Sequence, residues 1–413
     1  MVAISRQACE QLDRDDSLAQ LRDEFSIPEG MIYLDGNSLG AKPRKALAKA
    51  TEIIEKQWGE GLIKSWNDAA WFELPYSLGN KVAKFIGADD GEVVVTDSTG
   101  INVYKTLAAA ISMRPDRRVI VMEGSNFPTD NYMAQGLLAQ LGGDYEIRFA
   151  EEDELEAAIK DDVAVVCLTQ VHYKSGRILD MSGLTQKIHQ VGAIAIWDLC
   201  HSAGSIEVDL NACNVDFAVG CTYKYLNGGP GSPAFIFMAK RHQGKAQQPL
   251  TGWWGHAEPF AFERDYRPAQ GIGQMLSGTQ PIVSLALVEV GLDVFALADM
   301  KAVRKKSQAL SQLFIDLVEA RCAEYDFSLV SPRDAELRAS QVSFAHQHGY
   351  PIVQALIASG VIGDFRAPDN MRFGFTPLYV RYVDVWDAVD RLVSIMTSAS
   401  WQQPEFNKRS AVT

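Results

Sequence analysis

The sequence predicts an α/β protein with a seven-stranded, mainly parallel sheet and a smaller C-terminal α+β domain. Three observations lead to this fold class: short apolar runs alternate with helical stretches, the chain has 413 residues, and the pattern changes after about Pro281. A hydrophobic content of 47% is sufficient for a large core. Strands separated by helical spacers are typical of parallel α/β sheets.

Seven apolar runs are the predicted strands of the large sheet. They span Glu92–Thr96, Arg118–Met122, Tyr145–Phe149, Val163–Thr169, Ala193–Asp198, Phe217–Thr222 and Ala234–Met238. Helical patterns such as Lys105–Met113 and Leu184–Val191 lie between them. The last two runs are joined by a Gly-Gly-Pro-Gly turn that is too short for a crossover helix, so we expect that pair to be antiparallel.

The C-terminal part of the chain mixes helices and strands. A long helical stretch begins at Val283 and continues past Leu310. The later predicted elements are strands at Phe327–Val330, Gln341–Ala345 and Met371–Phe375, and helices at Ile352–Ala358 and Val383–Met396. We therefore divide the chain into an N-terminal arm (1–40), a large α/β domain (41–285) and a small α+β domain (286–413).

Charge and composition exclude several classes of function. The net charge is −13 and no segment gathers basic residues into a stripe, so we expect no nucleic-acid partner. The six cysteines and seven histidines lack the spacing of a disulfide framework or a metal site. The N-terminus has no apolar signal core, and no run reaches membrane-spanning length. We expect a cytoplasmic protein that binds neither metal nor membrane.

Two residues at successive strand ends suggest a cofactor. Lys224 follows the apolar run that starts at Phe217, and Asp198 ends the preceding run, with His201 close behind. Ligands bind at the carboxyl ends of strands in such sheets. A lysine amine can bind the aldehyde of pyridoxal phosphate covalently, and a carboxylate keeps its pyridine nitrogen protonated. Alternatively, Asp198 only caps a helix and His201 is a structural histidine.

Other strand ends carry candidate ligands for the same cofactor. Ser98 and Thr99 open a helix, where hydroxyls and free N–H groups can bind a phosphate, although an ordinary N-cap is equally consistent. Phe127 could stack on a ring or close the core, and Asp130 could act in catalysis by orienting a proton, could orient the cofactor, or could form a turn. The Thr169 hydroxyl could reach a ring substituent or cap its strand.

Arg372 lies between apolar residues in the predicted small domain. A buried arginine needs an anionic partner, and its planar guanidinium matches a carboxylate in two parallel hydrogen bonds. That carboxylate could belong to a substrate or to an internal ion pair, and the sequence leaves both open.

Together these motifs resemble the fold-type I pyridoxal-phosphate enzymes, and among them the kynureninase family in its bacterial form. The Tyr-Lys-Tyr-Leu-Asn-Gly-Gly-Pro-Gly run at 223–231 and the Trp-Asp-Leu-Cys-His run at 197–201 are the most specific. The resemblance extends over nearly the whole chain and also includes Tyr33–Gly40, Ile63–Asn67, Val95–Thr99, Phe127–Asp130, Gly252–His256, Gly278–Pro281 and Met371–Gly374.

The resemblance implies a role for each matching residue. Lys224 would bind pyridoxal phosphate covalently, and Asp198 would pair with the ring nitrogen. The other implied cofactor ligands are Ser98, Thr99 and Tyr223 at the phosphate, Phe127 on the ring, Asp130, Thr169 and His201 around it, and Trp253 and Thr279 from the second subunit of a homodimer. Arg372, together with Ser38, would bind the substrate α-carboxylate.

The resemblance also implies the reaction, which is the hydrolytic cleavage of the β,γ carbon–carbon bond of L-kynurenine to anthranilate and L-alanine. This step belongs to the kynurenine pathway of tryptophan catabolism and NAD biosynthesis. Tyr223 would transfer a proton or only bind the phosphate. Trp66 and Gly278 would lie near the substrate ring, where Trp66 offers an apolar wall with one donor and Gly278 offers only backbone, so 3-hydroxykynurenine would be the poorer substrate. Alternatively, Trp66 is a core aromatic residue remote from the ring.

Three rival functions remain open at this stage. One is a cysteine desulfurase, which would need a mobile nucleophilic cysteine, whereas Cys322 lies in a helical pattern. The second is an aminotransferase, and the third is an inactive relative that only binds ligand. Intact Lys224, Asp198 and Arg372 argue against the third.

Overall fold

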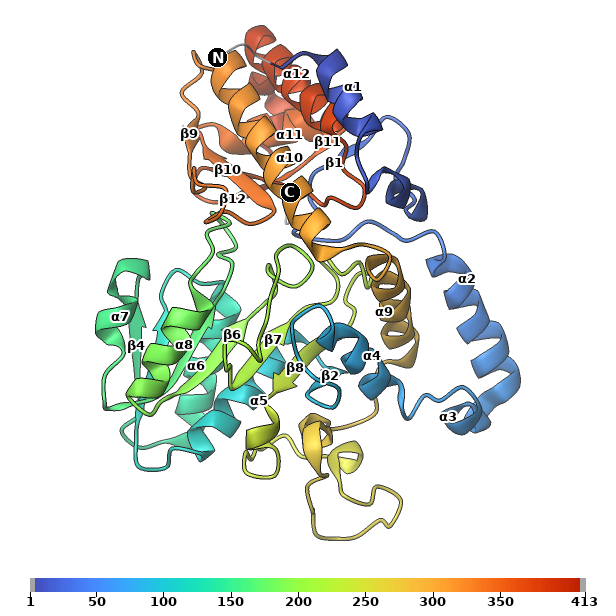
Figure 1. The fold of residues 1–413 in the computed structure, drawn as a ribbon, viewed down its shortest axis with the longest axis vertical. Coiled ribbons are helices and arrows are strands. Elements are labelled where there is room, and N and C mark those ends of the chain that lie inside the picture. Colours follow the sequence, from blue (N-terminus) through green and yellow to red (C-terminus); the bar gives the residue numbers. More distant parts are fainter. Residues whose placement is uncertain (1–3, 409–413) are drawn as a thin grey trace.

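The structure is a computed structural model that describes residues 4–408 of the chain. It has two lobes, a large one built on the seven-stranded sheet and a smaller one that contains the C-terminal helices (Figure 1). In the described part of the chain, no helix is long and apolar enough to cross a membrane.

The large sheet has the strand order β2-β8-β7-β6-β5-β3-β4. Its strands are β2 (Val93–Thr96), β3 (Val119–Glu123), β4 (Glu146–Ala150), β5 (Val163–Thr169), β6 (Ile194–Asp198), β7 (Phe217–Gly220) and β8 (Ala234–Met238). The predicted fold class is therefore confirmed, with strand ends within two residues of those expected. Only β8 is antiparallel to its neighbours, β2 and β7, which confirms the orientation predicted from the short turn.

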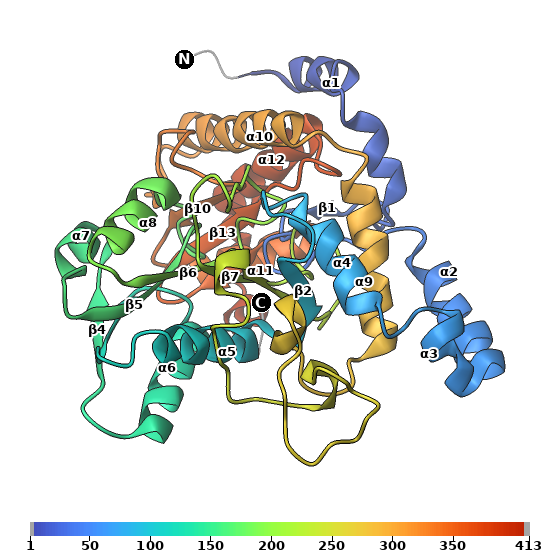
Figure 2. The same ribbon diagram turned by 60° about the horizontal axis from the view of Figure 1, so that its bottom comes forward.

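Alternating side chains of the central strands fill both faces of this sheet. In β6, Ile194 and Ile196 join the core formed with α5 (Thr99–Ser112) and α6 (Pro128–Leu141), which lie along one face (Figure 2). Ala195 and Trp197 point to the other face, where the Trp197 indole donates to Thr185 of α8 (Met181–Gln190) at 3.0 Å. Burial on both faces explains why these strands are continuous apolar runs in the sequence.

The small lobe contains an antiparallel sheet in the order β12-β13-β10-β9. Its strands are β9 (Ser328–Leu329), β10 (Gln341–Ala345), β12 (Asp364–Arg366) and β13 (Asn370–Gly374). The sheet packs with α10 (Met300–Arg321) and α11 (Gly349–Ala358), and α12 (Tyr382–Ser398) packs against these two helices. The sequence did not predict β12, because three residues are too few for a periodic signal.

The helical stretch predicted from Val283 past Leu310 is two helices rather than one. Helix α9 (Ile282–Phe295) ends before Asp299, whose side chain accepts a hydrogen bond from the Ala302 N–H at 3.2 Å and caps α10. An aspartate in this position satisfies a backbone donor that a new helix leaves free, so the chain breaks and restarts here.

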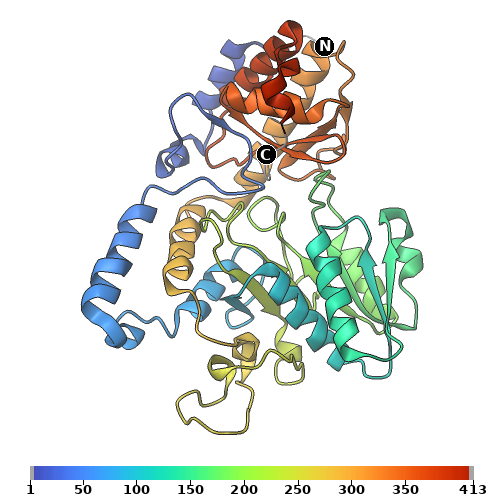
Figure 3. The same ribbon diagram turned by 180° about the vertical axis from the view of Figure 1, so that it is seen from behind.

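The N-terminal residues join the small lobe. Strand β1 (Ile32–Tyr33) pairs in parallel with β11 (Val361–Ile362), and Asp13 of α1 (Arg6–Arg14) accepts hydrogen bonds from two N–H groups at the start of α12, at 2.7 and 3.0 Å. The chain then runs through α2 (Ala46–Thr51), which stands at the side of the molecule (Figure 3). The division into three domains stays a prediction.

Candidate active site

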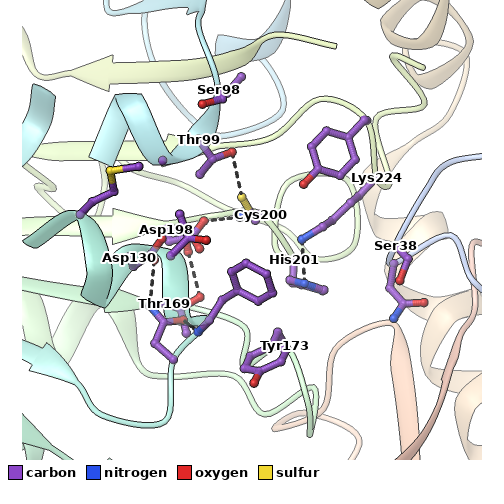
Figure 4. Close-up of a pocket in the computed structure, with 18 of the residues that line it drawn as sticks. Ser38, Ser98, Thr99, Asp130, Thr169, Tyr173, Asp198, Cys200, His201 and Lys224 are labelled. Carbon is purple, nitrogen blue, oxygen red and sulfur yellow. Dashed lines mark hydrogen bonds between the residues drawn. The ribbon is translucent and has the colours of Figure 1, made fainter. Parts of the chain in front are cut away.

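A cavity of about 430 Å³ lies between the two lobes, at the carboxyl ends of the parallel strands. Figure 4 shows Ser98 and Thr99 at one side of it, Asp198 and Asp130 beyond them, and Lys224 with His201 opposite. The predicted site residues that line it are Ser38, Ser98, Thr99, Phe127, Asp130, Thr169, Asp198, His201, Tyr223, Lys224 and Arg372. The structure thus brings together side chains that are as far apart in the sequence as Ser38 and Arg372.

Lys224 lies in the turn after β7, which ends at Gly220 and so stops two residues earlier than predicted. The Gly40 N–H donates to the Tyr223 carbonyl at 2.7 Å and fixes this turn. Lys224 Nζ lies 2.9 Å from His201 Nε2, and no carboxylate of the described residues forms an ion pair with it. The amine is therefore available at the cavity.

His201 is a neutral partner for that amine. Its side chain is buried, and burial together with the positive charge of Lys224 lowers the pKa of His201 well below its usual range. A neutral imidazole can accept a hydrogen bond at Nε2 while its other nitrogen carries the proton. His201 Nδ1 has no hydrogen-bond partner among the described residues. His201 thus positions the Lys224 amine by a hydrogen bond and places no second positive charge beside it.

Two carboxyl groups meet beside the amine. Asp198 ends β6 and accepts a hydrogen bond from the Cys200 N–H at 2.7 Å, and Asp130 lies in the first turn of α6, where the Asn126 amide donates to it at 2.8 Å. Burial and the neighbouring charge of Asp198 raise the pKa of Asp130 well above its usual range. Burial beside a second carboxyl group therefore favours the protonated form of Asp130.

The start of α5 forms an open end of the cavity. Ser98 is the N-cap residue, but its side chain makes no capping hydrogen bond, so the ordinary N-cap interpretation does not account for it. Uncapped N–H groups and the helix dipole favour an anion such as a phosphate. Asp97 precedes Ser98 in the chain. The charge of Asp97 is neutralised by the buried Lys105, whose Nζ lies 2.6 Å from the Asp97 carboxylate.

Two aromatic rings lie at the cavity wall. Phe127 is 47% exposed and contacts Tyr173 edge to face, with 5.3 Å between the ring centroids. Because the Phe127 ring is half exposed, it does not close a core and can stack on a flat ligand. The sequence did not identify Tyr173, which lies in a loop with no distinguishing pattern.

Tyr223 also lines the cavity. The neighbouring Cys221 thiol and burial raise the pKa of Tyr223 above its usual value. The protein groups alone therefore keep its hydroxyl protonated, and a lowered pKa would have to come from a bound ligand. Thr169 is buried at the end of β5, and its hydroxyl donates only weakly, at 3.4 and 3.5 Å, to the Val171 and Asp198 carbonyls.

Arg372 combines both roles that the sequence left open. It lines the cavity and is also held in an internal ion pair with Asp364, with Nε 2.8 Å from Oδ1. Its remaining contacts are the Ser38 hydroxyl at 2.8 Å and the Tyr173 carbonyl at 2.6 Å. The sequence missed Asp364 because the cross-strand register that places it opposite Arg372 depends on β12.

Four predicted residues do not line the cavity of this chain: Trp66, Trp253, Gly278 and Thr279. Trp66 packs in an aromatic cluster, with ring centroids 6.1 Å from Trp253 and 5.2 Å from Trp254. Gly278 and Thr279 are exposed just before α9. No group of His, Cys, Asp and Glu within residues 4–408 could hold a metal ion.

The cavity fits pyridoxal phosphate. An amine without an anionic partner, a buried carboxylate, an uncapped helix N-terminus and a half-exposed ring line the same space. They match the aldehyde, the pyridine nitrogen, the phosphate and the ring face of the cofactor, respectively. Lys224, Asp198, Ser98 with Thr99, and Phe127 are the residues that would hold these four parts.

Solved structures of other proteins share this fold. A cysteine desulfurase from Thermococcus onnurineus superposes with a TM-score of 0.76 at 18% identity, over 92% of this chain and 97% of the other. A C-DES mutant with glycine covalently linked to its PLP cofactor gives a TM-score of 0.78 at 16% identity, over 90% and 98%. The fold is therefore that of the fold-type I pyridoxal-phosphate-dependent enzymes.

Relatives in sequence narrow the class. A kynureninase of Burkholderia pseudomallei is 57% identical over 97% of this chain and 98% of the relative, and a kynureninase of Pseudomonas fluorescens is 54% identical over 99% and 100%. Residues 303–392 also match the kynureninase C-terminal domain family. The chain belongs to the kynureninase family, as its motifs predicted.

Proposed function

We propose that the protein is a hydrolase that uses pyridoxal phosphate to cleave L-kynurenine at the β,γ carbon–carbon bond, giving anthranilate and L-alanine. The observation that carries the proposal is the meeting of the Lys224 amine and the Asp198 carboxylate in one cavity, in a chain of the kynureninase family. A reaction with these products belongs to tryptophan catabolism. The cytoplasmic location of the protein stays a prediction from the sequence.

When bound, pyridoxal phosphate supplies an electron sink for the bonds that change. Lys224, at the cavity wall beside neutral His201, removes and returns the proton at the substrate α-carbon. Asp198 would pair with the ring nitrogen of the bound cofactor, and its negative charge would favour the protonated pyridine. Protonated Tyr223 is a candidate proton donor to the reacting carbon after water adds to the γ-carbonyl. Its alternative role is a hydrogen bond to the phosphate only.

The direct test is an assay for anthranilate release from L-kynurenine by purified protein supplied with pyridoxal phosphate. Stoichiometric anthranilate and L-alanine support the proposal. A keto-acid product would instead indicate an aminotransferase, and spectral binding of L-kynurenine without turnover would indicate a ligand-binding relative. A desulfurase is disfavoured because Cys322 is buried at the end of α10 and does not line the cavity.

The proposed assembly is a homodimer with shared active sites, in which Trp253 and Thr279 of one subunit reach the cofactor phosphate of the other. Two features support it. Trp253 is 36% exposed, Thr279 is also exposed, and neither residue lines the cavity of its own chain. Exposed apolar residues also follow α2, with Trp58 60% and Ile63 77% exposed. Apolar patches of this kind commonly mark interfaces.

We also propose that L-kynurenine is preferred over its 3-hydroxy derivative. Trp66 offers an apolar wall, and a buried hydroxyl without a partner costs about 1–3 kcal/mol, or about a five- to 150-fold preference. Because Trp66 packs beside Trp253, it would reach the ring together with that residue, across the dimer interface. The ratio of specificity constants is to be measured in wild type and in Trp66→His with Thr279→Asn. A ratio that the double change leaves unmoved would contradict this role.

A further inference from the structure

The phosphate end of the cavity contains an acidic residue close to where an anion would bind. Asp97 comes directly before the uncapped start of α5 and lines the cavity together with Ser98 and Thr99. Its side chain is 25% exposed. A carboxylate beside an anion site repels the ligand unless a positive charge compensates it. The site therefore needs a cation close to Asp97.

Lys105 supplies this positive charge. Its Nζ lies 2.6 Å from Asp97 Oδ2, and among residues 4–408 no other basic side chain forms an ion pair with Asp97. The Thr96 hydroxyl donates to the same carboxylate oxygen at 2.9 Å. Lys105 is fully buried, and water and salt screen buried charges much less than exposed ones. Lys105 and Asp97 thus form one neutral pair at the cavity wall.

Helix geometry explains how Lys105 reaches Asp97. Lys105 lies about two turns after Ser98 in α5, and helical side chains tilt toward the helix N-terminus. The lysine therefore extends back to the residue that precedes the helix. Its Nζ also donates to the Met275 carbonyl at 2.8 Å, which is a neutral acceptor. Within the described part of the chain, the charge of Lys105 is thus paired with Asp97 alone.

We propose that Lys105 is a positioning residue for the cofactor: by cancelling the charge of Asp97, it keeps the start of α5 able to bind the phosphate of pyridoxal phosphate. Lys105 does not line the cavity, so it acts through Asp97 rather than by contact with the ligand. This inference rests on the proposed function for the identity of the cofactor. It assigns a role to a buried lysine that the reaction itself does not use.

The experiment compares two ligands that differ only in the phosphate, pyridoxal phosphate and pyridoxal. Their dissociation constants are measured at pH 8 by absorbance titration of the full-length protein freed of cofactor. The proteins are wild type, Lys105→Met, and a double variant that combines Lys105→Met with Asp97→Asn.

The unpaired Asp97 charge in Lys105→Met predicts roughly a 10- to 100-fold weaker binding of pyridoxal phosphate. Binding of pyridoxal should change by less than about threefold, because this ligand carries no phosphate for Asp97 to repel. The double variant contains neither charge, so its affinity for pyridoxal phosphate should return to within about threefold of wild type.

Lys306→Met serves as the matched control. Lys306 of α10 is also a buried lysine, with Nζ 2.7 Å from Asp16 and 2.6 Å from the Pro377 carbonyl, but it lies in the small lobe and does not line the cavity. Chemical denaturation should show a loss of stability similar to that of Lys105→Met, because each variant leaves a carboxylate and a carbonyl without their amine. Both dissociation constants should stay unchanged in the control.

Three results overturn the inference: binding of pyridoxal phosphate that Lys105→Met does not weaken, equal weakening of both ligands, or a double variant that binds pyridoxal phosphate as weakly as Lys105→Met. If Lys105→Met does not fold, the double variant decides, because recovery of wild-type affinity supports charge compensation and its loss contradicts it. Failure of the wild type to release anthranilate would instead remove the proposed reaction, whereas cofactor binding would still test Lys105.

Discussion

At the scale of single residues, the state of each active group is set by its immediate neighbours. Lys224 lies against a neutral histidine, and burial and the charge of Asp198 raise the pKa of Asp130 well above its usual range. The residue type alone predicts neither property. A histidine with its usual pKa can be neutral or charged in the physiological pH range, whereas an aspartate with its usual pKa is charged.

Asp198→Asn is expected to lower turnover much more than substrate binding. A neutral amide no longer favours the protonated pyridine, so we expect kcat for L-kynurenine to fall by roughly 10²- to 10³-fold, within the range of acid–base contributions. The check is a comparison of kcat with the dissociation constant of L-kynurenine, with the surface variant Asp153→Asn as control. An effect confined to binding would make Asp198 structural.

The carboxyl of Asp35 predicts a pH dependence of substrate binding. Burial and the charge of Asp364 raise the pKa of Asp35 to about 7, although Arg372, Ser38 and Arg366 act in the opposite direction. Below this pH Asp35 is neutral, and its charged neighbours Arg366, Arg372 and Asp364 together carry one net positive charge. Above this pH Asp35 ionises and cancels that charge. The KM for L-kynurenine should therefore rise as the pH increases through 7.

The expected rise in KM is roughly three- to tenfold, the effect of one partly screened charge at close range. Asp35→Asn is the matched test, because an uncharged amide should make the profile flatter. Equal slopes in wild type and variant would assign the pH dependence to the substrate amine or the cofactor instead.

At the scale of elements, the site is a set of strand ends brought against the small lobe. The turns after β2, β3, β5, β6 and β7 supply the groups expected for the cofactor. Strands β12 and β13 supply Arg366 and Arg372, which line the same cavity. The loop that carries Tyr173 joins the two sets, since its backbone carbonyls accept hydrogen bonds from Arg372 and from Gln341 of β10. Movement of the small lobe would therefore move the carboxylate site.

Arg372→Lys is expected to weaken substrate binding and also to destabilise the protein. An ammonium group cannot contact both oxygens of Asp364 while also reaching Ser38 and the Tyr173 carbonyl. Lost hydrogen bonds to buried charged groups predict a loss of about 1–3 kcal/mol in unfolding free energy. Chemical denaturation and the KM for L-kynurenine are the measurements. A variant with raised KM and unchanged stability would contradict the role of Asp364 as the anchor of Arg372.

At the scale of the whole molecule, the two-lobed shape leaves conspicuous apolar surface uncovered. The segment from α2 to Ile63 stands at the side of the large lobe, and the loop that contains Trp253 and Phe260 protrudes at the far end from the small lobe (Figures 1 and 3). Leu47, Phe260 and Phe262 are all more than 60% exposed. A second subunit that covered these residues would remove this surface from water.

A mixing experiment tests the shared active sites. Lys224→Ala and the double variant Trp253→Ala with Thr279→Ala are each expected to be nearly inactive when alone. If Trp253 and Thr279 act across the interface, a mixed dimer contains one site with all wild-type groups. An equal mixture that exchanges subunits at random should then recover about a quarter of wild-type anthranilate release. No recovery after demonstrated subunit exchange would place both residues in their own subunit's site.

Local patterns determined much of the fold. The buried strands of the large sheet are apolar on both faces, so each appeared as a continuous run, and the short glycine-rich turn alone fixed the antiparallel orientation of β8. The same patterns placed Asp198 and Thr169 at strand ends and Lys224 close behind one, in the turn after β7. The break between α9 and α10 was missed because the segment that joins them, 296–299, contains no glycine or proline to interrupt the helical pattern.

The sequence by itself therefore determined the strands of the large sheet and most of the side chains that share the cavity, but not Tyr173 or Arg366. Only the tertiary structure decided which of them pair. The contact of Arg372 with Asp364 depends on the register of a three-residue strand, and the raised pKa of Asp130 depends on its burial against a residue 68 positions away. Hydrogen bonds and charges act over a few ångströms in space, and the sequence does not state which distant residues the fold brings within that range.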